Sequence, residues 1–172
     1  GTALKTELHQ LYDRCDGVAF SLSPEAKGAR KVKTLVLTYA AASDPGKAAE
    51  LAAYQYDKAD NMTDRQGALM VLCSLDCGER DMALADFYKR HQGDALVIDK
   101  WFSLQATSLH PNVLDHVKAL AEHGDFTLSN PNRVRALYMA MAGNPLAFHA
   151  GDGEGYRLIG DLIRKLDPLN PQ

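Results

Sequence analysis

The chain has 172 residues, 46% of them hydrophobic and 24% charged, and its formal net charge at pH 7 is −3. This length fits one domain with a sizeable core, and the composition is that of an ordinary globular protein. The small negative charge gives no electrostatic reason to expect nucleic acid or an anionic membrane as a partner. No apolar run approaches the roughly 20 residues of a membrane-spanning helix, and the residues from Gly1 to Lys5 do not resemble a signal peptide. We therefore expect a soluble protein.

Three cysteines, Cys15, Cys73 and Cys77, form an odd set without the spacing of a disulfide framework. Cys73 and Cys77 are four residues apart on one predicted helix and could share a metal ion, but no second pair completes a tetrahedral site. We interpret both as small buried apolar residues. Reduced thiols and the lack of an export signal favour a cytoplasmic location.

Helix starts are marked by capping side chains, and nothing along the chain has the alternating pattern of a strand. Four pairs place a capping residue before a proline: Ser23-Pro24, Asp44-Pro45, Asn130-Pro131 and Asn144-Pro145. Thr63 and Gln66 predict a capping box. The expected helices span residues 3–14, 24–42, 45–58, 63–76, 79–91, 94–108, 112–123, 131–142 and 155–166.

Apolar residues recur at the i, i+3, i+4 spacing of buried helix faces. The predicted stripes are Val32, Leu35, Val36, Tyr39 and Ala40; Ile98, Trp101, Phe102 and Gln105; Val113, Val117, Leu120 and Ala121; Val134, Leu137, Tyr138 and Met141; and Ile159, Leu162, Ile163 and Leu166. The segment Ala68–Cys73 is apolar all round and should be central. Lys27, Arg30 and Lys31 form a basic strip that a solvated helix face explains.

Short connections between many helices require neighbouring helices to run antiparallel. The sequence has no 34-residue self-similarity and no tetratricopeptide signature. We therefore predict an all-α fold, an irregular superhelix of antiparallel helix pairs of the HEAT or armadillo kind, with residues 1–172 as one helical-repeat domain.

The sequence contains none of the common catalytic or metal-binding motifs. There is no His-Glu-x-x-His, no Gly-x-Ser-x-Gly and no phosphate-binding loop. The histidines offer no ligand pair at i, i+4 with a nearby carboxylate; they are His9, His91, His110, His116, His123 and His149. We predict no catalytic residue, no metal site and no cofactor in this chain.

Glycines occupy alternate positions before the last predicted helix, at Gly151, Gly153 and Gly155. Such a segment can adopt unusual backbone angles and aim N–H groups at an anion. It follows a helix rather than a strand, so it is not a dinucleotide fingerprint, and it lacks the later ligands of a calcium loop. A loop at a binding cavity and a flexible link between helices both remain open.

Two arginines, Arg133 and Arg135, occupy the first turn of the predicted helix 131–142, where the helix dipole disfavours positive charge. Free backbone N–H groups together with a guanidinium would form an anion site. The alternative is that Asp125 or another acid pairs with one of the arginines.

Several segments in order resemble one known family. They are residues 60–64 (Asp-Asn-Met-Thr-Asp), 99–102 (Asp-Lys-Trp-Phe), 126–133 (Phe-Thr-Leu-Ser-Asn-Pro-Asn-Arg), 147–156 and the final Asn-Pro-Gln at 170–172. This succession is similar to the C-terminal helical domain of bacterial alanyl aminopeptidases, the aminopeptidase N zinc metallopeptidases. The likeness by motif runs from about Asp60 to the end of the chain.

The resemblance implies a function for the whole enzyme and a role for this part. The family binds zinc through His-Glu-x-x-His and a distant Glu in an upstream catalytic domain, and removes N-terminal amino acids from peptides. Its C-terminal domain caps the catalytic cavity and restricts access of substrate. Arg135 matches an arginine of the cavity wall, and Arg133 accompanies it. The implied partners are the upstream catalytic domain and the peptide substrate.

The family continues beyond its Asn-Pro-Gln with further helices, so the chain resembles a piece cut inside that domain. We therefore expect the last helix to leave an apolar face open and to favour self-association. Two other functions remain open: a free-standing helical scaffold that binds peptides or partner proteins, and an independent hydrolase, which the lack of a nucleophile–base arrangement disfavours.

Overall fold

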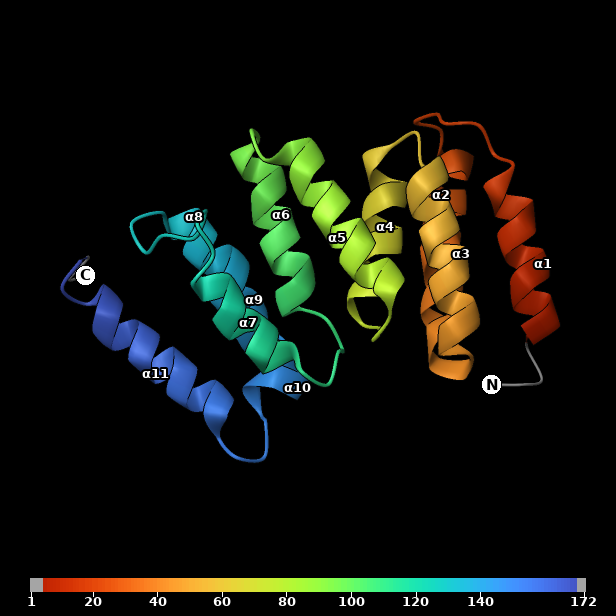
Figure 1. Cartoon of the computed structure of the whole chain (residues 1–172). Helices are drawn as coiled ribbons and strands as arrows, with labels where there is room; N and C mark the ends of the chain where they lie inside the picture. Colours follow the sequence, from red (N-terminus) through yellow and green to blue (C-terminus); the bar gives the residue numbers. More distant parts are fainter. Residues whose placement is uncertain (1–4, 170–172) are drawn as a thin grey trace. The chain divides into compact units, whose positions relative to one another are not determined.

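The computed structural model describes residues 5–169, and these residues form helices and connecting loops without any strand (Figure 1). The all-helical prediction is confirmed, and each predicted helix is present within about three residues of its expected ends. Residues 3 and 4 of the first expected helix lie outside the described part. The helices are α1 (Lys5–Asp16), α2 (Pro24–Ser43), α3 (Pro45–Lys58), α4 (Met62–Cys73), α5 (Gly78–His91), α6 (Ala95–Ala106), α7 (Val113–Ala121), α8 (Pro131–Val134), η2 (Arg135–Met139), α9 (Ala140–Ala142), α10 (Pro145–Phe148) and α11 (Glu154–Leu166).

The chain divides into two compact units, residues 1–86 and residues 87–172, and the division falls within α5. Each unit has its own set of packed helices. The expectation of one domain over residues 1–172 stays a prediction.

In the first unit, α2 is the central helix and packs against α1, α3 and α4. The helices α2 and α4 come closest at Gly67, where an added Cβ would overlap Thr34 Oγ1. The absence of a side chain at Gly67 therefore allows this packing. The segment Ala68–Cys73 is buried as predicted, except for Met70.

The predicted buried stripe of α2 is partly wrong. Val36 and Ala40 are buried, but Leu35 is 53% and Tyr39 59% exposed. The buried face of α2 instead includes the charged residues Arg30 and Lys33. A hydropathy pattern places charged residues on the surface, so the predicted buried face of α2 is displaced from the true one. Arg30 and Lys33 can be buried because each has hydrogen-bond or ion-pair partners.

The helix caps are largely as expected. Ser23 accepts a hydrogen bond from the amide of Ala26, and Asp44, Asn130 and Asn144 cap their helices in the same way. The predicted capping box of Thr63 and Gln66 is wrong. The N-cap of α4 is Asn61, whose side chain accepts from Asp64 N at 2.9 Å, because asparagine is the stronger capping residue.

In the second unit, α6 packs against α7 and against the helix formed by α8, η2 and α9, while α11 packs against α9 and α10. The four stripe residues predicted for α6 are all buried, as are those predicted for residues 131–142. In α7 the stripe is buried except for Ala121, which is half-buried. The Trp101 ring meets the Phe102 ring edge-on, with centroids 5.2 Å apart, and Tyr88 and His123 surround Trp101.

The helix at residues 131–142 contains one π-helical turn. It starts as the α-helical turn Pro131–Val134, continues as the π turn Arg135–Met139, and returns to α at Ala140–Ala142. A π turn closes i→i+5 hydrogen bonds and often occurs at functional sites. The sequence pattern predicts this helix but not its π turn.

The last helix, α11, buries less of its predicted stripe than expected. Only Leu162 is buried, Ile159 and Leu166 are half-buried, and Ile163 is 60% exposed. Tyr156 at its start is also exposed. The helix therefore leaves apolar side chains open, and self-association through it stays a prediction. The motif at residues 170–172 lies outside the described residues.

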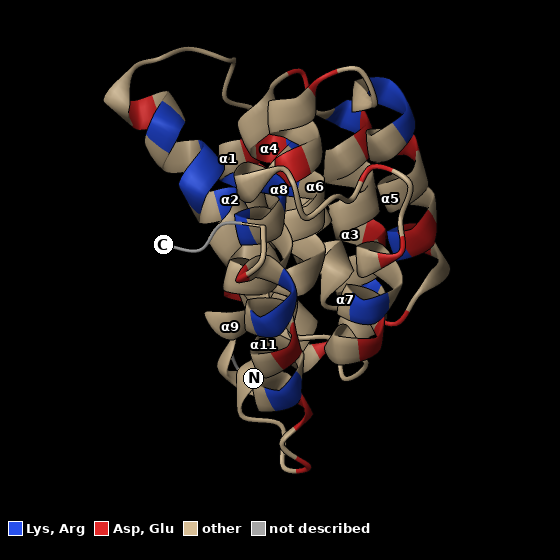
Figure 2. Ribbon diagram, turned by 90° about the vertical axis from the view of Figure 1, so that its left-hand side faces the viewer, with Lys and Arg blue, Asp and Glu red and all other residues tan. Residues whose placement is uncertain are grey.

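Acidic and basic residues are mixed along the helices, for example on α5 and α11 (Figure 2). Each of the two helices has acidic residues in its first turn, Glu79 and Asp81 in α5 and Glu154 in α11, and basic residues in its last turn, which the helix dipole favours. Among the described residues, no helix has both the length and the hydropathy needed to cross a membrane.

Candidate functional site

Arg133 lies inside the second unit, and its guanidinium has partners on Nε, on Nη1 and on one face. Its Nε donates to Asp99 Oδ1 at 2.5 Å, and its Nη1 donates to the backbone carbonyl of Asp125. The guanidinium also lies over the ring of Phe102, with Cζ 4.8 Å from the centroid. One of the two arginines is therefore paired with an acidic residue, which is Asp99.

Arg135 lies on the outside of the same helix and is exposed. Its Nη1 is 3.4 Å from Asn132 Oδ1, a long contact that leaves most of the guanidinium available. Arg135 lines a shallow, open hollow whose other residues come from α6 and from the start of its own helix: Asp99, Lys100, Ser103, Asn132 and Ala136. The structure thus separates the two arginines, one inward and one outward.

The charge of this hollow is set by α6 and η2. Lys100 is exposed, and Asp99 is held by Arg133 through a side chain that is only 16% exposed. Because Arg133 neutralises Asp99, the exposed charges of the hollow are the cations Lys100 and Arg135. The arrangement suits an anionic group such as a carboxylate.

The first-turn amides of this helix are not free. Asn130 Oδ1 accepts hydrogen bonds from the amides of Asn132 and Arg133, at 3.1 and 3.3 Å. The anion site that combines free N–H groups with a guanidinium therefore lacks these two donors. What remains available at this helix is the side chain of Arg135.

A second feature of the hollow, which the sequence does not reveal, is the hydroxyl of Ser103. Ser103 Oγ donates to the backbone carbonyl of Ala136 at 3.0 Å and so joins α6 to the π turn. No motif marks this serine. A search for hydroxyl residues on a helix that packs against an irregular turn could have found it, once that turn was known.

Two of the three glycines before α11 have structural reasons. Gly153 has a φ of +75°, in the left-handed region that favours glycine. At Gly155 an added Cβ would overlap the backbone carbonyls of Ala147 and Phe148, because α11 starts directly against α10. Gly151 has neither constraint. The geometry thus explains the glycines at 153 and 155, and a role of this segment at a binding cavity stays a prediction.

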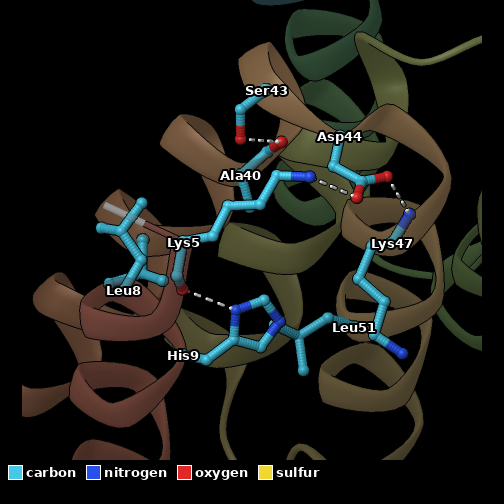
Figure 3. A pocket seen from close by; sticks show the side chains of 9 residues that line it. Lys5, Leu8, His9, Ala40, Ser43, Asp44, Lys47 and Leu51 are labelled. Atoms are coloured by element: carbon cyan, nitrogen blue, oxygen red, sulfur yellow. Dashed lines mark hydrogen bonds and ion pairs between the residues drawn. The ribbon is translucent and has the colours of Figure 1, made fainter. Parts of the chain in front are cut away.

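The first unit has a small cavity between α1, α2 and α3 (Figure 3). Lys5 Nζ and the amide of Lys47 both donate to the carboxylate of Asp44, and His9 Nδ1 lies 2.9 Å from the carbonyl of Lys5. The hydrogen bond from Lys5, with that from the Lys47 amide, lowers the pKa of Asp44. The cavity volume of about 20 Å³ holds one water molecule, so it is not a substrate site.

A larger polar cavity of about 310 Å³ lies in the first unit beside the buried Lys33. Lys33 Nζ is 2.7 Å from Asp16 Oδ1 and 3.3 Å from Asp64 Oδ2. Gln55 donates to the backbone carbonyl of Asp64 and accepts from Tyr12 Oη. The interactions with Asp16 and Asp64 outweigh burial, so the pKa of Lys33 is raised. This network joins α1, α2, α3 and α4.

Arg30 corrects the prediction of a solvated basic strip. Lys27 and Lys31 are exposed, but Arg30 is buried, with its guanidinium over the Phe20 ring at 5.0 Å and a hydrogen bond to the Ser21 carbonyl. Arg30 therefore fixes the loop between α1 and α2.

The cysteines and histidines form no metal centre in the described part of the chain: no group of three or more His, Cys, Asp or Glu side chains could hold a metal ion there. Cys73 and Cys77 are not on one helix, because α4 ends at Cys73. Burial raises the pKa of the Cys73 thiol to about 12, and Cys77 is half-buried. The rings of His110 and His116 lie 4.6 Å apart, a contact that their spacing in sequence did not indicate.

Short helices joined by loops and packed on their neighbours, as described for each unit, are typical of helical-repeat proteins. The chain belongs to the family described as "Domain of unknown function (DUF3458_C) ARM repeats", whose model matches residues 1–172. The predicted fold class is therefore confirmed.

Curated relatives confirm the resemblance found in the sequence. The chain is 37% identical over 172 residues to aminopeptidase N of Escherichia coli (strain K12), covering 99% of this chain and 20% of that protein. It is 37% identical over 171 residues to aminopeptidase N of Haemophilus influenzae, covering 99% and 19%. The chain thus spans about one fifth of the length of these relatives and corresponds to their helical C-terminal part.

A solved structure has the same fold. It is a crystal structure of Legionella pneumophila aminopeptidase A in complex with aspartic acid, with a TM-score of 0.89 and 37% sequence identity. The match covers 99% of this chain and 21% of that chain.

Proposed function

We propose that this chain is the non-catalytic C-terminal domain of a zinc metalloaminopeptidase of the aminopeptidase N type, an enzyme that removes N-terminal amino acids from peptides. The observation that carries the proposal is the likeness of the whole chain, at 37% identity, to one fifth of each of two aminopeptidases N. In this proposal the zinc and the catalytic residues lie upstream in the same polypeptide, since the described residues offer no cluster that suits zinc.

The proposed role of this part is to cap the active-site cavity, to restrict access of substrate and to contribute part of the peptide-binding wall. Arg135 supports the role, because it is exposed, faces an open hollow and has only a long contact to Asn132. Arg133 contributes indirectly in this proposal, because its ion pair with Asp99 fixes the start of the helix that carries Arg135. The proposed partners are the upstream catalytic domain and the peptide.

The three cysteines are free thiols, which supports a cytoplasmic location as part of this proposal. The alternative is a free-standing helical scaffold for peptides or partner proteins, and the coding sequence upstream of this chain distinguishes it from the aminopeptidase. A His-Glu-x-x-His motif several hundred residues upstream in the same reading frame supports the aminopeptidase, and a reading frame without it supports the scaffold.

The kinetic test replaces Arg135 by Ala in the full-length protein. If Arg135 binds the far end of the substrate, kcat/KM for longer peptides should fall about 10- to 100-fold through KM, because a charge-assisted hydrogen bond contributes about 1.5–3 kcal/mol. Dipeptide-sized substrates should lose much less. Arg164→Ala is the matched control, since Arg164 is an exposed arginine that pairs only with Asp161 three residues away. Equal losses for short and long substrates, or none, would refute the role of Arg135.

A further inference from the structure

The π turn at residues 135–139 leaves one backbone carbonyl without its usual helical donor. In an α-helix the amide of Ala140 would donate to the carbonyl of Ala136, four residues earlier. Here that amide donates to the carbonyls of Arg135 and Leu137 instead. Ala136 is buried, and its carbonyl accepts a hydrogen bond from a side chain outside the helix.

The replacement donor comes from the neighbouring helix α6. Ser103 Oγ donates to Ala136 O at 3.0 Å, and the Ser103 side chain is half-buried between the two helices. Ser103, Arg135 and Ala136 line the same hollow. One hydroxyl therefore supplies the donor at the point where the π turn departs from α-helical hydrogen bonding.

We propose that Ser103 is a positioning residue for Arg135, acting by stabilising the π turn in which Arg135 is the first residue. The inference rests on the proposed function of Arg135 in binding peptide. The direction in which Arg135 leaves the helix depends on the i→i+5 pattern, because an α-helical pattern places successive side chains differently around the axis. Ser103 does not itself bind the peptide; it favours the backbone that directs Arg135 into the hollow.

The test uses Ser103→Ala in the full-length protein, with longer and dipeptide-sized substrates. We expect KM for the longer peptides to rise about 3- to 10-fold with kcat unchanged, in the same direction as Arg135→Ala but smaller. Ser103→Thr keeps the hydroxyl and should restore KM. In the double variant Ser103→Ala/Arg135→Ala, KM should equal that of Arg135→Ala alone, because the serine acts only through the arginine.

Thr107, the C-cap residue of α6, provides the matched control. Its hydroxyl donates to the carbonyl of Ser103 at 2.8 Å and does not contact the π turn, so Thr107→Ala removes similar chemistry one helical turn away. KM should stay unchanged in this variant. A lower melting temperature for Ser103→Ala with an unchanged KM would overturn the positioning role, and so would additive effects of Ser103→Ala and Arg135→Ala.

A crystal structure of the full-length Ser103→Ala protein separates this inference from the proposed function. A return of residues 135–139 to α-helical hydrogen bonding, with Arg135 turned away from the hollow, supports the role of Ser103 in directing Arg135. An unchanged π turn and an unchanged Arg135 overturn it. If Arg135→Ala leaves the kinetics of longer peptides unchanged, the proposed function fails, and the structure still decides about Ser103.

Discussion

Each of the two units buries a cation that forms ion pairs among its helices, Lys33 and Arg133, and these two cations are satisfied in different ways. Lys33 in the first unit lies between two carboxylates, Asp16 and Asp64, which reach it from other helices. Arg133 in the second unit has one carboxylate, Asp99, together with a backbone carbonyl and the face of an aromatic ring. Lysine acts here as a point charge, whereas the planar guanidinium uses several geometries at once.

The difference explains how each centre serves its unit. The Lys33 centre joins three helices through charge and a fourth, α3, through the hydrogen bonds of Gln55, but Asp64 Oδ1 stays buried without a hydrogen bond. The Arg133 centre fixes one helix end, since its ion pair and its stacking both act on the turn that precedes Arg135. The ion pairs of Lys33 thus hold several helices of the first unit together, whereas those of Arg133 fix one helix end in the second.

The largest expected effect is that of Arg133→Ala. This change leaves the half-buried Asp99 without its partner and removes the contact with Phe102, so unfolding free energy should fall by about 3 kcal/mol. Urea denaturation followed by circular dichroism measures it. Arg135→Ala, two residues away and exposed, is the matched control and should cost less than about 0.5 kcal/mol. Similar losses for the two variants would contradict the separation of an inner and an outer arginine.

A smaller loss is expected for Lys33→Met. Methionine fills a similar volume but leaves two carboxylates near each other, one of which, Asp16, can reach water. The unfolding free energy should fall by about 2–3 kcal/mol. Lys31→Met, on the exposed side of the same helix, is the control, with an expected change below about 0.5 kcal/mol. A neutral or stabilising Lys33→Met would mean that desolvation of the buried charges outweighs their attraction.

The smallest effect is a difference in pH dependence. The pKa of Lys33 is raised above its ordinary 10.5 in the folded chain, so its stabilisation is fully present below pH 10.5 and is lost as pH rises through the folded value. The loss caused by Lys33→Met should therefore shrink above pH 10.5. The loss caused by Arg133→Ala should stay constant, because guanidinium keeps its proton. Urea denaturation of both variants and the unchanged protein, from pH 8 to about 11.5, checks this. Parallel behaviour of the two variants would remove the distinction between the centres.

Much of the fold could be predicted from the sequence, because helix caps and apolar spacing are local properties. Ser23, Asp44 and Asn130 cap helices as expected, and the stripes of α6 and of residues 131–142 are buried. Arg133 and Arg135 were singled out by their position against the helix dipole. Which of them turns inward depends on Asp99, more than thirty residues away.

The remaining features depend on tertiary contacts that spacing does not encode. Lys33 and Arg30 are buried only because their partners come from other segments, and Leu35 and Tyr39 are exposed as a result of the same shift of face. The π turn accepts a hydrogen bond from Ser103 on a different helix, a contact that local spacing does not indicate. The N-cap of α4 is Asn61 and not the predicted Thr63. The two residues are two positions apart, and the sequence pattern does not distinguish between them.

The position of Trp101 has a practical consequence for spectroscopy. It is the single tryptophan of the chain, is 8% exposed, and its ring lies edge-on to Phe102, the ring over which the Arg133 guanidinium stacks. Its fluorescence emission therefore reports on the second unit, while the first unit contains no tryptophan at all. Emission and far-ultraviolet ellipticity recorded on one sample would distinguish the melting of one half of the molecule from the melting of the whole.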